Sequence, residues 1–196
     1  MAYHIGIFGS AFNPPTRGHQ DVIQQAASVC EHIVLVPSFK HAFAKKMLDF
    51  ESRLKLTQIF SEECTATDCK VTVTDIEKHL FTNRPSVPVY TYDLMNAMQQ
   101  HCNHCRSDNQ LIFIRGPDNA NPAVWSRFYR YKDIEAKWQI FTATEQMSIR
   151  SSSVRKILAD NQEQQQKHAM LADFLTPEVL QSIFTQGLFM SEHDTE

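Results

Sequence analysis

The chain has 196 residues, of which 42% are hydrophobic and 21% are charged, and these proportions are ordinary for a globular domain. A formal net charge of −3 argues against a general nucleic-acid binder, because such proteins have a surplus of basic residues. No apolar run approaches the ~20 residues of a membrane helix, and the N-terminus lacks the pattern of a signal peptide, so we expect a cytoplasmic protein with no membrane segment.

The first predicted element is the apolar run Ile5–Phe8, which reads as a buried strand. A loop of small residues and prolines follows over residues 9–19, and an amphipathic helix is predicted over residues 21–30. A strand, such a loop and a helix in this order are typical of a phosphate site, because N–H groups of the loop and of the helix N-terminus point at the anion. Thr16 and His19 would add side-chain donors where that helix begins.

Four further strand-like runs follow, with helical patterns between them. The strands are expected at Ile33–Val36, Val71–Val73, Leu111–Ile114 and Ile140–Phe141, and the helices near Phe50–Phe60 and Tyr92–Gln100. Strands that alternate with helices predict an α/β fold, here a Rossmann-like, doubly wound parallel sheet of about five strands. Ligands of such sheets bind outside the carboxyl ends of the strands, where the loop over residues 9–19 is expected to lie.

The strand pattern ends at Phe141, and C-terminal helices are predicted over Ser151–Leu158 and from Pro177 to Phe184. The polar residues 160–166 are expected to form a solvated helix end or a loop, and the acidic residues 191–196 a flexible tail. We therefore expect one domain over residues 1–190, whose C-terminal helical part covers about residues 148–190.

A second candidate phosphate site is the run Ser148-Ile149-Arg150-Ser151-Ser152-Ser153-Val154-Arg155. Serines before an apolar helical pattern are N-cap candidates, and a helix that starts there offers free N–H groups, hydroxyls and the positive end of its dipole. Arg155 would lie one turn inside the helix, where a planar guanidinium can reach back to a phosphate through two parallel hydrogen bonds.

The five cysteines are expected to be mostly free thiols, since the chain shows no secretion signal. Residues 101–105, His-Cys-Asn-His-Cys, have zinc-ligand spacing, and Cys64 and Cys69 would have to supply the second ligand pair. Because that pair is spaced more loosely than usual, we expect incidental surface thiols. A structural zinc at Cys64, Cys69, Cys102 and Cys105 is the alternative.

Two of these segments resemble motifs of the nucleotidyltransferase superfamily. Thr16-Arg17-Gly18-His19, preceded by Phe12-Asn13-Pro14, resembles the (H/T)xGH signature, and the run from Ile149 to Arg155 resembles ISSTxxR, with Ser152 in place of threonine and Arg150 in place of the first serine. Threonine at position 16 is the tolerated alternative to histidine and is typical of the nicotinamide mononucleotide branch. The resemblance implies transfer of a nucleotide monophosphate from a nucleoside triphosphate to a phosphate-bearing acceptor.

Nearly the whole chain resembles one branch, the pyridine-nucleotide adenylyltransferases. The matching segments are Val36-Pro37, Lys45-Lys46 with Arg53, Tyr90-Thr91-Tyr92-Asp93-Leu94, Gly116-Pro117-Asp118-Asn119, Trp125 and Leu175–Phe189. In that family, a lysine and an arginine near the second strand bind substrate phosphate. The aspartate of GxDN accepts hydrogen bonds from ribose hydroxyls, and an aromatic residue stacks on the pyridine ring.

The resemblance implies an enzyme of NAD biosynthesis, a nicotinate or nicotinamide mononucleotide adenylyltransferase that uses ATP with Mg²⁺ and needs no metal ligand from protein side chains. The catalytic residues would be His19, Thr16 and Arg155; ATP would bind at Gly9, Ser10, Phe12, Gly18, Gly116, Asp118, Ile149, Ser151 and Ser152; and the acceptor at Lys45, Lys46, Tyr90, Thr91 and Trp125. Nicotinate mononucleotide is the expected acceptor, and use of nicotinamide mononucleotide as well is left open. Assembly into a homo-oligomer is also left open. The alternatives are a phosphopantetheine adenylyltransferase and a nucleotide-binding regulatory domain without turnover.

Overall fold

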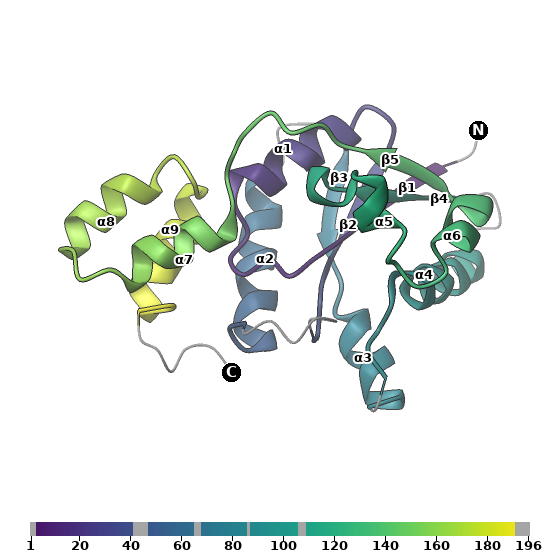
Figure 1. Ribbon diagram of the computed structural model, residues 1–196, viewed down its shortest axis with the longest axis horizontal. Helices are drawn as coiled ribbons and strands as arrows, with labels where there is room; N and C mark the ends of the chain where they lie inside the picture. The colour runs from purple at the N-terminus through teal and green to yellow at the C-terminus, as the bar shows by residue number, and fades with distance from the viewer. Residues whose placement is uncertain (1–2, 41–46, 65–67, 86, 106–108, 191–196) are drawn as a thin grey trace.

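Five parallel strands form the central sheet of the protein (Figure 1). The computed structural model describes residues 3–40, 47–64, 68–85, 87–105 and 109–190. The sheet order is β3-β2-β1-β4-β5, and the strands are β1 (Tyr3–Ser10), β2 (His32–Pro37), β3 (Lys70–Val73), β4 (Asn109–Arg115) and β5 (Gln139–Thr142). All neighbouring strands pair in parallel, so the predicted α/β fold with a doubly wound sheet is confirmed.

The strand order reverses between β1 and β4. From β1 the chain builds outward through β2 to β3, and it then crosses to the other side of β1 to add β4 and β5. Ile7 of β1 therefore pairs with Val34 of β2 on one side and with Phe113 of β4 on the other. A reversal of this kind opens a crevice at the carboxyl ends of the two strands that flank it, and this is where doubly wound sheets bind ligands.

Both faces of the sheet are covered by helices, as the alternation within single strands shows. Ile33 and Leu35 of β2 belong to one apolar cluster, whereas Val34 and Val36 belong to the other. Side chains of a strand point alternately to its two faces, so each cluster lies on its own side of the sheet. Continuous apolar runs such as that of β2 arise because a parallel sheet is buried on both faces.

The first face packs against helices from both ends of the chain: α1 (Arg17–Ala26), α2 (Phe50–Glu63), α7 (Ser151–Ala159), α8 (Gln164–Leu171) and α9 (Pro177–Gln186). The second face packs against helices from the middle: α3 (Ile76–Asn83), α4 (Thr91–Cys105), α5 (Pro122–Trp125) and α6 (Tyr131–Lys137). Figure 1 shows α7, α8 and α9 as a group beyond α2, whereas α4 and α6 lie on the other side of the strands.

The C-terminal helices are joined to the sheet through α2. The Glu63 carboxylate accepts hydrogen bonds from the Thr176 hydroxyl and, at 3.0 Å, from the backbone N–H of Glu178, at the start of α9. The predicted helices over 151–158 and 177–184 are present with slightly longer bounds. The polar stretch 160–166 is exposed and forms a loop that leads into a solvated helix start, as expected: α8 begins at Gln164, and its one buried residue, Leu171, joins the core. Residues 191–196 lie outside the described residues.

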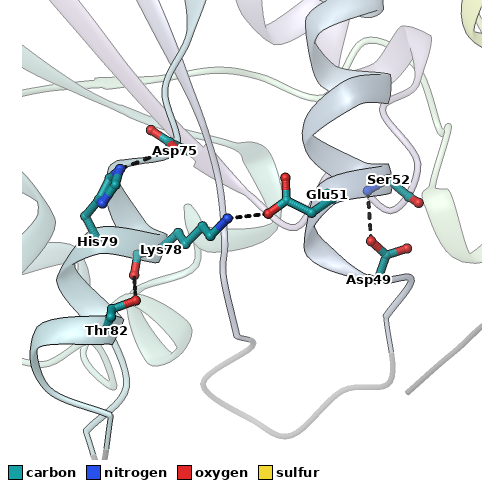
Figure 2. Close-up of polar contacts among 7 residues, drawn as sticks. All are labelled: Asp49, Glu51, Ser52, Asp75, Lys78, His79 and Thr82. Atoms are coloured by element: carbon teal, nitrogen blue, oxygen red, sulfur yellow. Dashed lines mark hydrogen bonds and ion pairs between the residues drawn. The ribbon is translucent and has the colours of Figure 1, made fainter.

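Helix α3, which the sequence pattern does not predict, makes one ion pair with α2 and one within itself, both drawn in Figure 2. Lys78 of α3 pairs with Glu51 of α2, and His79 lies 3.3 Å from the Asp75 carboxylate one turn earlier. Exposed pairs of this kind each contribute little. The eight-residue helix is held mainly by Ile76 and Leu80, which pack against the second cluster.

Sequence reasoning also missed α5, α6 and the short 3₁₀ helix over Pro117–Asn119, which are too short to show a clear apolar period. Within the described ranges, no helix is long and apolar enough to cross a membrane.

Candidate active site

The loop between β1 and α1 lies at the reversal of strand order and brings His19 to the carboxyl end of β1. Gly9 and Ser10 end the strand beside Val36 and Pro37 of β2. Phe12, fully buried, has a φ of 45°, a backbone conformation that residues with a side chain seldom adopt and that tends to occur at functional sites. The loop therefore turns sharply before α1 begins at Arg17.

Thr16 fixes the orientation of the His19 imidazole. The backbone N–H of Thr16 donates to Nδ1 of His19 at 3.1 Å, and the Thr16 hydroxyl oxygen lies 2.9 Å from the same nitrogen. A ring nitrogen that accepts a backbone N–H bears no proton, so a neutral His19 has its proton on Nε2. Nε2 in turn lies 3.1 Å from the Ser10 hydroxyl oxygen and faces the end of β1.

Two effects keep His19 neutral in the ligand-free protein. The ring packs at a tilt against Phe12, with 4.9 Å between ring centroids, and lies near Phe8. Loss of hydration in these surroundings, followed by the positive charge of Arg150, lowers the pKa of His19 to about 4. His19 is thus set up as an N–H donor from Nε2 at neutral pH, where its positive charge is absent.

The loop rests on a buried cation. Arg53 of α2 is 1% exposed, and its guanidinium donates to the carbonyl oxygens of Leu48 at 2.8 Å, Ala11 at 2.8 Å and Phe39 at 3.4 Å. The Asn13 side chain accepts the backbone N–H of Leu48 at 3.1 Å. The family resemblance implies that Arg53 binds substrate phosphate. Its guanidinium instead donates to three backbone segments and so holds the β1–α1 loop in place.

The start of α7 docks directly against this loop, so the two sequence motifs form one site. The Ser151 hydroxyl donates to the carbonyl oxygen of Pro14 at 2.8 Å, and Nη1 of Arg155 donates to that of Asn13 at 2.7 Å. Partial burial lowers the pKa of Arg155, which nevertheless stays cationic at neutral pH. Ser152 is exposed at the first turn, and the carbonyl of Ile149 faces Gly18. Two helix N-termini, those of α1 and α7, are therefore adjacent.

Gly18 is required by this close docking, and Gly18→Ala is expected to loosen it. A Cβ at position 18 would lie 2.8 Å from the carbonyl oxygen of Ile149, a backbone atom that cannot swing aside. We expect the free energy of unfolding to fall by about 1–3 kcal/mol, the usual cost of overpacking. Denaturant unfolding will measure it. Gly116→Ala is the matched control, because a Cβ there meets no atom within 4 Å; an equal loss of stability in both variants would contradict the explanation.

The carboxyl end of β4 supplies the third part of the site. Gly116 and Asp118 follow this strand, and one carboxylate oxygen of Asp118 lies 2.9 Å from Nη2 of Arg150. The same nitrogen lies 2.7 Å from the carboxylate of Glu145, which follows β5. Arg150, the departure from the family pattern, therefore joins the segments after β4 and β5 to the start of α7.

Trp125 is not an open platform for a ring. It is 4% exposed, it stacks on Phe113 with 5.8 Å between centroids, it contacts Phe128, and Arg115 lies over its ring at 4.8 Å. Its indole N–H donates to Glu135 at 2.8 Å. A stacking role for Trp125 stays a prediction, and it requires these neighbours to move.

The remaining acceptor residues are placed less closely. Tyr90 and Thr91 are partly exposed at the start of α4, where the Tyr90 ring lies 4.9 Å from that of Tyr129. Lys45 and Lys46 lie outside the described residues.

The expectation of surface thiols is wrong for the four cysteines whose side chains the structure describes. Cys30, Cys64, Cys69 and Cys102 are all buried, because their side chains pack into the apolar clusters on the two faces of the sheet. Cys64 and Cys69 belong to the first apolar cluster and Cys102 to the second, on the opposite face of the sheet. This separation argues against the zinc alternative, and among the described residues no three metal-binding side chains converge.

Comparison with known proteins agrees with this geometry. Residues 7–157 match the model of the cytidylyltransferase-like family. Curated proteins of two Leptospira species, each named "Probable nicotinate-nucleotide adenylyltransferase", align with 66% of this chain: the Leptospira borgpetersenii protein is 24% identical over 134 residues and the Leptospira interrogans protein 22%. The alignment spans 59% of the length of these relatives.

Solved structures match over almost the entire chain. A crystal structure of a candidate nicotinate-nucleotide adenylyltransferase from Vibrio parahaemolyticus superimposes with a TM-score of 0.74 and 26% identity, covering 96% of both chains. The nicotinic acid mononucleotide adenylyltransferase of Plasmodium falciparum, solved with NaAD, has a TM-score of 0.68 at 17% identity, covering 95% of this chain and 97% of its own. The latter likeness shows the shared fold. With its family match over residues 7–157 and its two motifs joined at the end of β1, the chain belongs to the cytidylyltransferase-like family.

Proposed function

We propose that this protein is a nucleotidyltransferase that transfers the adenylyl group of ATP to nicotinate mononucleotide, forming deamido-NAD and pyrophosphate in NAD biosynthesis. The observation that carries the proposal is the docking of α7 on the β1–α1 loop, which places His19, Ser151 and Arg155 around one edge of the sheet. The names of the Leptospira and Vibrio relatives support the choice of acceptor.

The reaction needs positioning and charge stabilisation more than a protein nucleophile. An oxygen of the mononucleotide phosphate attacks the α-phosphorus of ATP, a new P–O bond forms, and the bond from the α-phosphorus to the bridging oxygen breaks as pyrophosphate leaves. The attacking oxygen is already anionic, so no covalent enzyme intermediate is required. Preorganised donors that meet the charge developing on the phosphates supply most of the acceleration in such reactions.

Each residue of the site then has a distinct task. His19 donates its Nε2 proton to an α- or β-phosphate oxygen, and Thr16, buried behind the ring, positions it and does not itself face the substrate. Arg155, with Ser151 and Ser152 at the start of α7, binds the leaving pyrophosphate. Backbone N–H groups of the loop after Gly9 add donors, and Asp118 binds the ribose hydroxyls.

Magnesium enters as part of the substrate. Since the described residues offer no cage of carboxylates, Mg²⁺ would be held by phosphate oxygens and water, as is usual for this ion. It would offset part of the negative charge of the triphosphate, while His19 and Arg155 position the phosphate oxygens.

We also propose that residues 1–190 act as one nucleotidyltransferase domain. Support comes from α7, which belongs to the C-terminal helices but donates Ser151 and Arg155 to the loop of β1.

The acceptor is tested by comparing kcat/KM for nicotinate and nicotinamide mononucleotide, with pyrophosphate release as the readout. We propose that donors near Tyr90 and Thr91 meet the carboxylate of the nicotinate ring; an amide would leave one of them unpaired, so we expect ~10²-fold preference for the nicotinate form, which corresponds to ~3 kcal/mol. Phosphopantetheine serves as the control acceptor and should give no pyrophosphate. Equal or reversed values for the two mononucleotides would refute the preference, and no release with either would refute the transferase itself.

A further inference from the structure

Arg150 connects three segments at the edge of the candidate site. It is the N-cap residue of α7, and a single nitrogen of its guanidinium, Nη2, contacts both Asp118 after β4 and Glu145 after β5. Two carboxylates therefore share one cation. This small cluster, which we call the Arg150 clasp, has one negative charge in excess.

The Arg150 clasp is close to the candidate phosphate-binding residues, but its ion pairs are partly exposed to solvent. The charge of Arg150 is felt at His19, where it disfavours protonation of the ring. The side chains of Arg150, Asp118 and Glu145 are 35%, 67% and 44% exposed, so water screens their attraction. Exposed ion pairs of this kind exchange partners readily when a stronger anion arrives.

A triphosphate beside His19 would be such an anion. It would repel the two carboxylates and attract the guanidinium, whose long flexible stem starts at the N-terminus of α7, next to Ser151 and Ser152. Arginine binds phosphate oxygens through paired charge-assisted hydrogen bonds, which are stronger than its bond to one exposed carboxylate.

We propose that Arg150 is a further phosphate-binding residue that Asp118 and Glu145 hold back in the ligand-free protein, and that Glu145 competes with the nucleotide for it. On binding, Arg150 moves from the carboxylates to the triphosphate, and Asp118 becomes free to accept the ribose hydroxyls. This inference rests on the proposed function, because it takes the triphosphate of ATP as the ligand.

The proposal predicts opposite effects for the two ends of the ion pair. Arg150→Ser, which restores the serine of the family motif, should weaken binding of MgATP about tenfold, because a charged phosphate contact is lost. Glu145→Gln should tighten it about threefold, because the competing anion is gone. In the double variant, the benefit of Glu145→Gln should vanish.

Calorimetric titration with MgATP in the absence of acceptor measures these effects without turnover. Adenine, which lacks both the phosphates and the ribose, should bind the wild type and both single variants equally. Glu62→Gln, an exposed charge change at the far end of α2, is the matched control and should leave binding unchanged. If the clasp is only structural, Glu145→Gln and Arg150→Ser will both weaken binding, or neither will change it, and either result overturns the proposal.

The two proposals fail in different ways. Wild type that binds MgATP and releases pyrophosphate, with variants that lack the opposite-sign pattern, refutes the role of Arg150 alone. The full pattern of binding changes in a protein that releases no pyrophosphate with any acceptor supports the role of Arg150 and refutes the transferase.

Discussion

Replacing His19 with alanine is expected to lower kcat ~10²–10³-fold, as does the loss of one donor from a preorganised oxyanion site. The structure explains why a single side chain has so large an effect. Thr16 holds Nδ1 through its backbone N–H, so the Nε2 proton is aimed in advance at the position where a phosphate would lie. A donor that needs no reorientation stabilises charge that develops in the transition state more than charge already present in the ground state. The KM for ATP should therefore change less than kcat.

Steady-state pyrophosphate release at saturating substrates measures this effect. His168→Ala removes an exposed histidine from α8, outside the candidate site, and should leave kcat unchanged. Retention of more than about half of the wild-type kcat by His19→Ala would show that the donor role is wrong.

The protonation state of His19 gives an independent check. Because burial and Arg150 lower its pKa from the ordinary 6.5 to about 4, the ring of the free protein should stay neutral as the pH falls from 8 to about 5. Nearby phosphates favour the imidazolium, so saturation with ATP should raise this pKa. An NMR titration of the ring carbons follows both values. A free-protein transition at pH 6.5 would contradict the environment described here.

Sequence reasoning succeeded where one physical cause dominates a local pattern. Continuous apolar runs such as Ile33–Val36 form strands because both faces of a parallel sheet are buried. The loop between β1 and α1 was identifiable because glycine, proline and a helix N-terminus occur at fixed offsets. In each case neighbouring residues determine the outcome.

The failures share the opposite cause, dependence on partners distant in sequence. Nothing near Arg53 indicates that its guanidinium will be sequestered by the carbonyls of Leu48, Ala11 and Phe39. The ion pairs of Arg150 depend on where β4 and β5 end, and the burial of Trp125 depends on how α5 folds over Phe113. The burial of two cysteines could have been predicted in part. Cys64 and Cys102 each follow an apolar helical pattern, which favours burial over exposure.

Replacing Arg155 with alanine is expected to lower kcat/KM ~10²–10³-fold, the second large effect. Its guanidinium has two tasks: Nη1 holds the carbonyl of Asn13, and the remaining N–H groups, which form no hydrogen bond within the described residues, are available to pyrophosphate. Removing a partly buried charge that makes paired hydrogen bonds to a phosphate costs several kcal/mol of transition-state stabilisation.

Arg155→Lys separates these two tasks. Lysine supplies a point charge and can still reach one carbonyl, but it cannot form two parallel bonds to a phosphate. We therefore expect near wild-type stability in Arg155→Lys. Its kcat/KM should be only about tenfold higher than that of Arg155→Ala, and its binding of ATP should be weaker than that of the wild type. Thermal unfolding and pyrophosphate release, measured on both variants, distinguish the outcomes. Full activity of Arg155→Lys would show that charge alone suffices, and an equal loss of stability in both variants would show that Arg155 acts only by holding the loop at Asn13.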